Sequence, residues 1–256
     1  MNGFGSLVRN HEDNKWGKMY RMMTEQRIGI LLIQETHLTS ARCDELHRMF
    51  ANRIKIWHSE CPEAPTMREG VAVVLNKRII SAEGAKATEV IPGRAIQLEV
   101  TWRGGDKRHL LCVYAPTSGG QKERGEFFAE LGKFYEERPD MPRPDIMAGD
   151  FNNTEDPRDR SPPQRREDTS VRCLGELKSK LDLMAVDGWR RTNPDKRDFT
   201  FFRGTGDAAT MSRLDRIYVN ENSAKWTKEW DITPQWGRAD RHSRSICSRT
   251  RNLRRK

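Results

Sequence analysis

Acidic and amide side chains follow the ends of two predicted buried strands. Glu35 ends the apolar segment IGILLIQE, and Asp150 ends PDIMAGD, with Asn152 two positions further on. A carboxylate at the end of a buried strand is unfavourable unless a cation or a hydrogen-bond donor meets it. Glu35 and Asp150 therefore suit a hard divalent ion such as Mg²⁺, which takes one or two carboxylates and keeps water and substrate phosphate as its other ligands.

Other polar residues stand at comparable positions. Tyr114 lies near the end of HLLCVYAP, Asp215 lies within RLDRIYV, and Asp240 and His242 follow near the C-terminus. A histidine could act as a base or donate to a phosphoryl oxygen as a cation, while an aspartate fixes its tautomer. Tyr114 and Asn152 could position phosphate and water. Because residues at strand ends can converge on one crevice, this set predicts metal-assisted attack on a phosphate.

Each of these residues also has a purely structural interpretation. Asp150 and Asn152 could form only a turn, because Asp, Asn and Gly are turn residues. Tyr114 could be a core ring, Asp215 could pair with a neighbouring arginine, and His242 could lie on the surface of its Arg-rich segment. The remaining histidines are expected to be structural or on the surface: His11, His37, His47, His58 and His109.

Helices and strands alternate along the chain. Helical spacing of apolar residues predicts four helices, over 14–27, 40–50, 121–137 and 171–186, with Ser40 as a plausible N-cap. Apolar runs predict strands over 28–35, 70–76, 94–102, 108–116, 144–150, 199–202 and 213–219, with 94–102 alternating as in a half-exposed strand. RGGDK predicts a hairpin turn before 108–116. Strands joined by helices in some places and hairpins in others predict a mixed sheet in an α/β protein.

The chain has 256 residues, which fits one large α/β domain better than two small ones. Its 46 Lys and Arg against 37 Asp and Glu give a formal charge of +9. This excess favours anionic partners such as nucleic acid or an acidic membrane surface, although a solvated basic surface has the same charge. We expect one domain over 1–247. The basic segment 248–256 is either a disordered tail that touches phosphates or the remnant of a longer chain.

The cysteine pattern and the hydropathy of the sequence indicate in which part of the cell the protein is found. The five cysteines are scattered and form no C-x-x-C pair, which argues against a disulfide framework or a zinc site. The longest apolar run, IGILLI, is far too short to cross a membrane, and the N-terminus has no apolar signal region. We therefore expect a soluble intracellular protein, nuclear or cytoplasmic, with no membrane partner.

Five motifs occur in an order typical of one enzyme family: IQETH, VYAP, GDFN, SRLDRI and a late D/H pair. The chain resembles the endonuclease/exonuclease/phosphatase family, which includes exonuclease III, AP endonucleases, deoxyribonuclease I and inositol polyphosphate phosphatases. The IQETHLT spelling resembles most the endonuclease domain of LINE-type non-LTR retrotransposons. So does a later D-x-W-R-x-x-x-P stretch (Asp187, Trp189, Arg190, Pro194) followed by FTFF.

The resemblance implies a four-layered α/β sandwich, in which two mixed β-sheets lie face to face with helices outside. It implies hydrolysis of a DNA phosphodiester with Mg²⁺ or Mn²⁺, leaving a 3′-hydroxyl that primes reverse transcription in a retrotransposon. The partners would be DNA and, if the chain is a fragment, the reverse transcriptase domain of the parent element. The loop PRDRSPPQRRED is the expected determinant of target-site preference.

The resemblance also implies a role for each matching residue. Glu35 would hold the metal, and Tyr114 would contact the scissile phosphate. Asp150 would activate or align the attacking water, with Asn152 beside it. Asp215 would orient His242, which would stabilise the charge on the phosphate. Four further contacts with metal or substrate are expected: Asp240, Asn2, Ser212 and Arg213.

Two departures from the family pattern bear on activity. The retrotransposon version opens with a strand ending in N-x-N-G, whereas this sequence begins MNGF, so that Asn2 matches the second Asn and the first strand would be lacking. The late D-H pair is D-R-H here, and Arg241 moves His242 by one position. A one-residue slip turns a strand side chain to the other face, unless a loop absorbs it.

Three other functions therefore remain open beside the retrotransposon endonuclease. An AP endonuclease of DNA repair would have the same basic charge. A phosphoinositide phosphatase is not supported by the net positive charge, and the sequence shows no apolar segment that would face a membrane. A catalytically inactive, truncated nucleic-acid-binding remnant would explain the two departures, and metal-dependent turnover separates it from the enzymes.

Overall fold

The computed structural model describes residues 3–8, 11–102, 104–163, 167–205, 209–234 and 244–250. The chain divides into two compact units, Met1–Tyr114 and Ala115–Lys256. One domain over 1–247 stays a prediction. Strand β13 (Arg244–Thr250) pairs with β12 (Thr227–Pro234) as far as Thr250.

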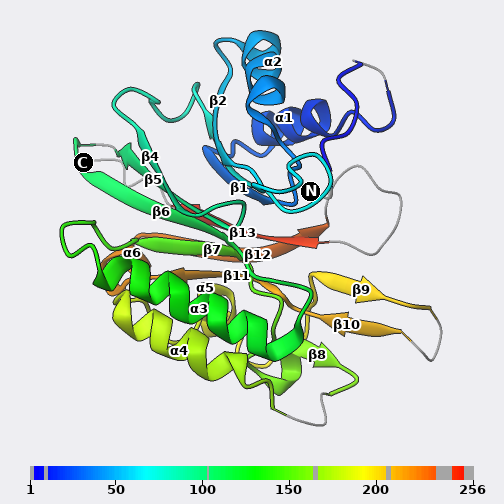
Figure 1. Cartoon of the computed structure of the whole chain (residues 1–256), viewed down its shortest axis with the longest axis vertical. Helices are drawn as coiled ribbons and strands as arrows, with labels where there is room; N and C mark the ends of the chain where they lie inside the picture. Colours follow the sequence, from blue (N-terminus) through cyan, green and yellow to red (C-terminus); the bar gives the residue numbers. More distant parts are fainter. Residues whose placement is uncertain are drawn as a thin grey trace. The chain divides into compact units, whose positions relative to one another are not determined.

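Two antiparallel sheets form the core of the first unit (Figure 1). In one sheet β3 (Val71–Asn76) lies between β1 (Ile30–Gln34) and β2 (Ile54–Ser59). The central position explains why five of the six residues in VAVVLN are apolar, since all six, including Asn76, are buried. In the other sheet three strands pair in chain order: β4 (Lys86–Ile91), β5 (Ala95–Thr101) and β6 (Lys107–Tyr114). Strand β3 contacts both β5 and β6, so the two sheets pack against each other.

Strand β5 differs from its prediction. The alternation in RAIQLEVTW predicted a half-exposed strand, but the first four residues of β5 are all buried, and Gln97 is 2% exposed. Strand β5 pairs with β4 and β6 on its two edges, and it also contacts β2 and β3 of the other sheet. The predicted hairpin is confirmed, because Thr101 pairs with Lys107 across the turn.

Two helices belong to the first unit. Helix α1 (Lys15–Glu25) begins at Asn14, whose side chain accepts a hydrogen bond from the amide of Gly17, 2.7 Å away. Helix α2 (Ser40–Phe50) is capped by Thr39 and not by Ser40, one residue earlier than predicted. Both helices bury one apolar face, as helical spacing predicts: α1 through Trp16, Met19 and Met23, and α2 through Cys43, Leu46 and Phe50.

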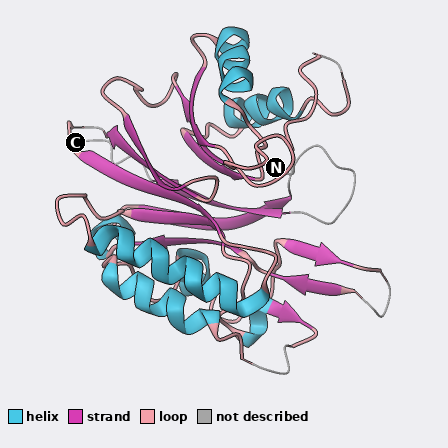
Figure 2. Ribbon diagram, viewed as in Figure 1, coloured by secondary structure: helices cyan, strands magenta, loops and turns pink. Residues whose placement is uncertain are grey.

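The second unit holds two long helices that lie side by side, α3 (Gly120–Glu136) and α4 (Ser170–Lys180) (Figures 1 and 2). Strand β7 (Ile146–Asp150) pairs antiparallel with β11 (Asp215–Val219). A smaller sheet has the order β8 (Arg160–Ser161), β10 (Thr210–Ser212), β9 (Phe201–Arg203). Three short helices complete the described part: η1 (Pro157–Asp159), α5 (Gly188–Thr192) and α6 (Glu221–Ala224).

The predicted α/β class, with β-sheets flanked by helices, is confirmed (Figure 2). Residues 3–8 contain no strand, and the first strand of the described ranges is β1. The four cysteines with described side chains are free: Cys43, Cys61, Cys112 and Cys173. None of the helices in the described ranges has the length and apolar character needed to cross a bilayer.

Candidate active site

Glu35 and Tyr114 meet in the first unit. Glu35 directly follows β1, and Tyr114 is the last residue of β6. The Tyr114 hydroxyl donates a hydrogen bond to Glu35 Oε1 over 2.6 Å. The tyrosine is 4% exposed, so it is a buried ring that also fixes a carboxylate. A neutral phenol orients the carboxylate without cancelling its charge, which leaves Glu35 suited to a cation.

The loop after β1 has an unusual backbone. Glu35 and His37 have φ of 53° and 47°, a left-handed conformation that side chains other than glycine rarely adopt. The amide of Thr36 donates to Gly70 O over 3.1 Å, and that of His37 donates to Glu69 O over 3.3 Å. Burial lowers the pKa of His37, and the nearby Glu35 carboxylate opposes this shift. Strained backbone held by its surroundings is typical of functional sites.

In the second unit, Asp150 and Asn152 form a turn at the end of β7. The amide of Asn152 donates to Asp150 Oδ1 over 2.9 Å, and Asn152 has φ of 49°. The Asn152 side chain donates to Ala115 O over 2.7 Å, and the amide of Ala115 donates to Asp150 O over 2.9 Å. Asp150 and Asn152 therefore do form a turn, and the turn fixes both side chains that the sequence singled out.

Asp215 lies opposite Asp150 in the pairing of β11 with β7. The Thr200 hydroxyl oxygen accepts from the amides of Leu214 and Asp215, over 3.0 and 3.1 Å. Burial raises the pKa of Asp215, and a hydrogen bond from the Thr200 side chain opposes this shift. The alternative of an ordinary salt bridge with a neighbouring arginine is not found in the described part of the chain, because Arg213 and Arg216 bind other groups.

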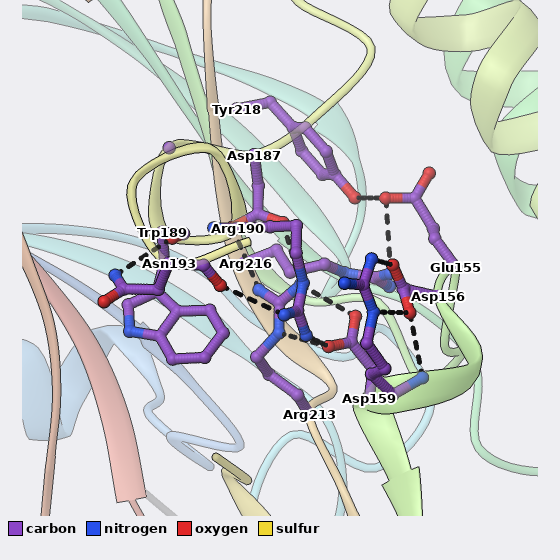
Figure 3. A network of polar contacts seen from close by, with 12 residues as sticks. Glu155, Asp156, Asp159, Asp187, Trp189, Arg190, Asn193, Arg213, Arg216 and Tyr218 are labelled. Carbon is purple, nitrogen blue, oxygen red and sulfur yellow. Dashed lines mark hydrogen bonds and ion pairs between the residues drawn. The ribbon is translucent and has the colours of Figure 1, made fainter. Parts of the chain in front are cut away.

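Arg213 and Ser212 differ from their predicted role. Arg213 is 1% exposed and Ser212 is 3% exposed. The Arg213 guanidinium lies between two carboxylates (Figure 3), donating to Asp159 over 2.9 and 2.7 Å and to Asp187 over 2.9 and 2.8 Å. Burial alone would lower the pKa of Arg213, but the two carboxylates raise it above its ordinary value. We therefore assign Arg213 a structural role in place of the predicted contact with substrate.

The D-x-W-R-x-x-x-P stretch supplies the rest of this ion-pair network. Asp187 caps α5, Arg190 binds Asp159, and the Arg190 guanidinium also donates to Pro194 O over 3.1 Å. The indole of Trp189 stacks with both arginines, each guanidinium carbon lying 5.0 Å from the ring centroid. The motif therefore joins α5 to the segments that carry Asp159 and Pro194 inside the second unit.

Sequence reasoning missed two acidic members of the network. Asp159 lies in the stretch predicted to be a surface loop, yet it is fully buried. Glu155 binds Lys178 and the Tyr218 hydroxyl, and its carboxylate lies 3.4 Å from Arg216 (Figure 3). No local signal distinguishes these residues from exposed acids, because Asp159 is buried and Glu155 half-buried by partners distant in the sequence.

The donor set at Glu35 fits a hard cation. Mg²⁺ is commonly held by one or two protein carboxylates, with water and phosphate completing its shell. No group of three or more His, Cys, Asp or Glu side chains in the described ranges is arranged to hold a metal. A Glu35-based site needs no such group. Three predicted site residues lie outside the described residues: Asn2, Asp240 and His242.

Comparisons with known proteins bear on the whole chain. A model of the Endonuclease/Exonuclease/phosphatase family matches residues 1–236. Over 213 residues the chain is 37% identical to the uncharacterized 149 kDa protein of transposon TX1 from Xenopus laevis. That match covers 80% of this chain, which spans 15% of the length of its relative.

Solved structures share the fold, in which mixed β-sheets are flanked by helices. The endonuclease domain of TRAS1, a telomere-specific non-LTR retrotransposon, has a TM-score of 0.63 at 12% identity, covering 94% of each chain. The AP endonuclease LMAP from Leishmania major has a TM-score of 0.67 at 14% identity, covering 91% of this chain and 81% of its own. The 3′-5′ exonuclease NExo from Neisseria meningitidis has a TM-score of 0.70 at 16% identity, covering 92% and 94%. With a family match over 236 of its 256 residues, the chain belongs to the endonuclease/exonuclease/phosphatase family.

Proposed function

We propose that this chain is a divalent-metal-dependent DNA endonuclease that nicks target DNA for retrotransposition. The observation that carries the proposal is the hydrogen bond of 2.6 Å by which Tyr114 orients the Glu35 carboxylate at the ends of two strands. Membership of a family of nucleases and phosphatases limits the chemistry to attack on a phosphate ester. The formal charge of +9 favours a polyanionic substrate.

Each residue of the first unit has a defined task in this reaction. Glu35 holds Mg²⁺ or Mn²⁺, which when bound neutralises charge on the phosphate under attack. Tyr114 keeps the Glu35 carboxylate in one orientation and contacts the scissile phosphate. Asn2 contributes an amide to the substrate.

The second unit contributes the groups that handle water and protons. Asp150 aligns the attacking water and accepts its proton, and the Asn152 amide lies next to it in the same turn. Asp215 orients His242, which stabilises the charge on the phosphate, and Asp240 assists. The oxygen of the attacking water bonds to phosphorus as the P–O bond to the 3′ oxygen breaks. The released 3′ oxygen takes up a proton from solvent, which leaves a 5′-phosphate and the 3′-hydroxyl that reverse transcriptase would use.

The retrotransposon assignment is supported by the 37% identity to a transposon protein. Because this chain spans 15% of that relative, a reverse transcriptase domain in the same parent element is part of the proposal. Two alternatives remain for test: a DNA-repair AP endonuclease and a catalytically inactive nucleic-acid-binding remnant. The similarity in fold to LMAP is the observation that favours testing for AP endonuclease activity.

Nicking of supercoiled plasmid by the purified chain tests the proposal. We expect Mg²⁺-dependent conversion to open circles that EDTA abolishes. Asp150→Asn keeps the hydrogen-bond acceptor for Asn152 but removes the charge, and it should slow nicking by about 10²- to 10⁴-fold. Glu35→Gln should raise the metal requirement. Asp140→Ala is the matched control for Asp150→Asn, because it removes an exposed carboxylate from the second unit, where Asp150 lies. It should nick normally.

The alternatives give different results in the same assay. Cleavage confined to an oligonucleotide with an abasic site would identify an AP endonuclease. A chain that is folded by circular dichroism, binds DNA and never nicks it would be the inactive remnant. Nicking that persists in EDTA or in Asp150→Asn would refute the metal-dependent mechanism.

A further inference from the structure

Arg94 contacts Tyr114 in three ways within the first unit. Its guanidinium carbon lies 5.3 Å from the centroid of the Tyr114 ring, a cation–π distance. Its NH1 group donates to Tyr114 O over 3.4 Å, and its own carbonyl accepts from the Tyr114 amide over 2.8 Å. The ring that orients Glu35 is therefore held at its face and at its backbone by one arginine.

Glu69 fixes the position of that arginine. Its carboxylate accepts from Arg94 NH2 over 2.8 Å, and the two side chains are only 16% and 14% exposed. A largely desolvated charge pair of this kind is much more rigid than a pair in water. Glu69 also has φ of 61°, so the chain adopts a strained left-handed backbone at this residue.

The Glu69 backbone reaches back to the loop that carries Glu35. The amide of His37 donates to Glu69 O, and that of Thr36 donates to Gly70 O. Glu35 therefore contacts Tyr114, Tyr114 contacts Arg94, and Arg94 contacts Glu69, whose backbone binds the loop after β1 that carries Glu35. This closed set of contacts restricts the positions of both the Glu35 carboxylate and the Tyr114 hydroxyl that donates to it.

Two glycines allow this close packing. A Cβ on Gly70, which has φ of 89°, would lie 2.7 Å from the Thr36 hydroxyl. A Cβ on Gly93, which has φ of 69°, would lie 2.9 Å from the Cα of Cys61. The amide of Gly70 donates to Gly93 O over 3.0 Å, which joins the Glu69 loop to the segment that carries Arg94.

We propose that Arg94 and Glu69 are positioning residues that set the orientation of Tyr114 and, through it, of the metal-binding carboxylate Glu35. The inference rests on the proposed function of that site. Neither residue needs to touch the substrate. Partners that orient the ligands of a metal commonly change metal affinity or activity by about 10- to 100-fold when they are removed.

Fluorine NMR on the chain labelled with 3-fluorotyrosine tests the positioning without any need for nuclease activity. The chain has four tyrosines, and Tyr114→Phe identifies the signal of Tyr114. Glu69→Gln removes the charge that pairs with Arg94, and we expect it to shift and broaden the Tyr114 signal, because Arg94 is released. Arg94→Lys should do the same, and it serves as the second variant if Glu69→Gln does not fold.

Arg53→Met is a matched control, because Arg53 lies over the ring of Tyr20 at 5.6 Å in the same unit. It should move the Tyr20 signal and leave that of Tyr114 unchanged. Electron paramagnetic resonance measures the affinity of the chain for Mn²⁺. This affinity should fall about 10- to 100-fold in Glu69→Gln and stay unchanged in Arg53→Met.

A double-variant comparison of plasmid nicking completes the test. If Glu69 acts through Tyr114, then Glu69→Gln adds no further loss to that of Tyr114→Phe. Unchanged Tyr114 signals and Mn²⁺ affinity in the Glu69 and Arg94 variants, in a chain that nicks DNA, would overturn the positioning role alone. Shifted signals and weakened Mn²⁺ binding in a chain that never nicks would support the positioning role and reject the proposed function.

Discussion

At the scale of single residues, Arg213 pairs with two buried carboxylates inside the second unit. It is 1% exposed and makes four hydrogen bonds to the carboxylates of Asp159 and Asp187. Asp159 ends η1 and Asp187 caps α5, so one side chain joins three separate segments. The charges offset one another only while all three are present, because each is removed from water.

Replacing Arg213 by methionine should therefore destabilise the chain strongly. Methionine fills similar space but removes the cation paired with Asp187 and one of the two arginines paired with Asp159; breaking such a buried pair typically costs about 3–5 kcal/mol of unfolding free energy. Urea denaturation followed by circular dichroism measures the loss. The control variant is Arg158→Met, which removes an exposed arginine from η1, the short helix that also contains Asp159. It should change the unfolding free energy little. Equal losses in the two variants would contradict a structural role for Arg213.

At the scale of elements, helix α5 packs closely against β12. A Cβ added to Gly188, the first residue of α5, would lie 2.1 Å from the Trp230 ring, far inside any real contact. Glycine at this position therefore lets the helix that carries Trp189 and Arg190 approach the strand. Gly175 offers a contrast, because it lies within α4 and a Cβ there would meet nothing within 4 Å.

The two glycines should respond oppositely to alanine. Gly188→Ala should destabilise the chain by about 1–3 kcal/mol, because the indole ring must move to admit the methyl group. Gly175→Ala should stabilise it by roughly 0.5–1 kcal/mol, since alanine loses less backbone entropy in a helix. Thermal unfolding of the two variants beside the parent chain gives both values. A stabilising Gly188→Ala would mean that α5 does not pack on Trp230.

Prediction from sequence succeeded for elements with a strong local pattern and failed where distant partners decide. GVAVVLN was recognisable as a buried strand because the residues from Val71 to Leu75 are all apolar. The segments of β12 and β13 were not predicted, because their polar and charged residues give no strand pattern. Helix α4 ends at Lys180 and not at 186, because Asp182 takes a left-handed φ of 56° soon after the helix.

The candidate site shows the same division. Strand ends identified Glu35, Tyr114 and Asp150 from the sequence. That the Tyr114 hydroxyl meets Glu35 depends on the packing of residues 79 positions apart, which no local pattern reveals. Arg213 was assigned to substrate from the family resemblance of its SRLDRI motif, whereas its two carboxylate partners come from segments 54 and 26 positions away.

At the scale of the whole molecule, the excess of basic residues predicts how the chain meets its substrate. The formal charge is +9, and several cations already pair with acids, such as Arg213, Arg190 and Lys178 in the second unit. Arginines and lysines in such pairs are not available to phosphates. The remaining basic side chains should bind the DNA backbone electrostatically, independently of base sequence and of the catalytic metal.

Binding to duplex DNA in EDTA should consequently weaken steeply with salt. Each neutralised phosphate contributes a slope of about −0.9 in a plot of log K against log salt, so about four contacts predict roughly a hundredfold loss between 50 and 200 mM. Fluorescence anisotropy with a labelled duplex measures the slope. Asp150→Asn should keep the slope and bind at least as tightly, because it removes a negative charge without removing a cation. A flat salt dependence would contradict this prediction, because it would mean that the basic side chains do not neutralise DNA phosphates.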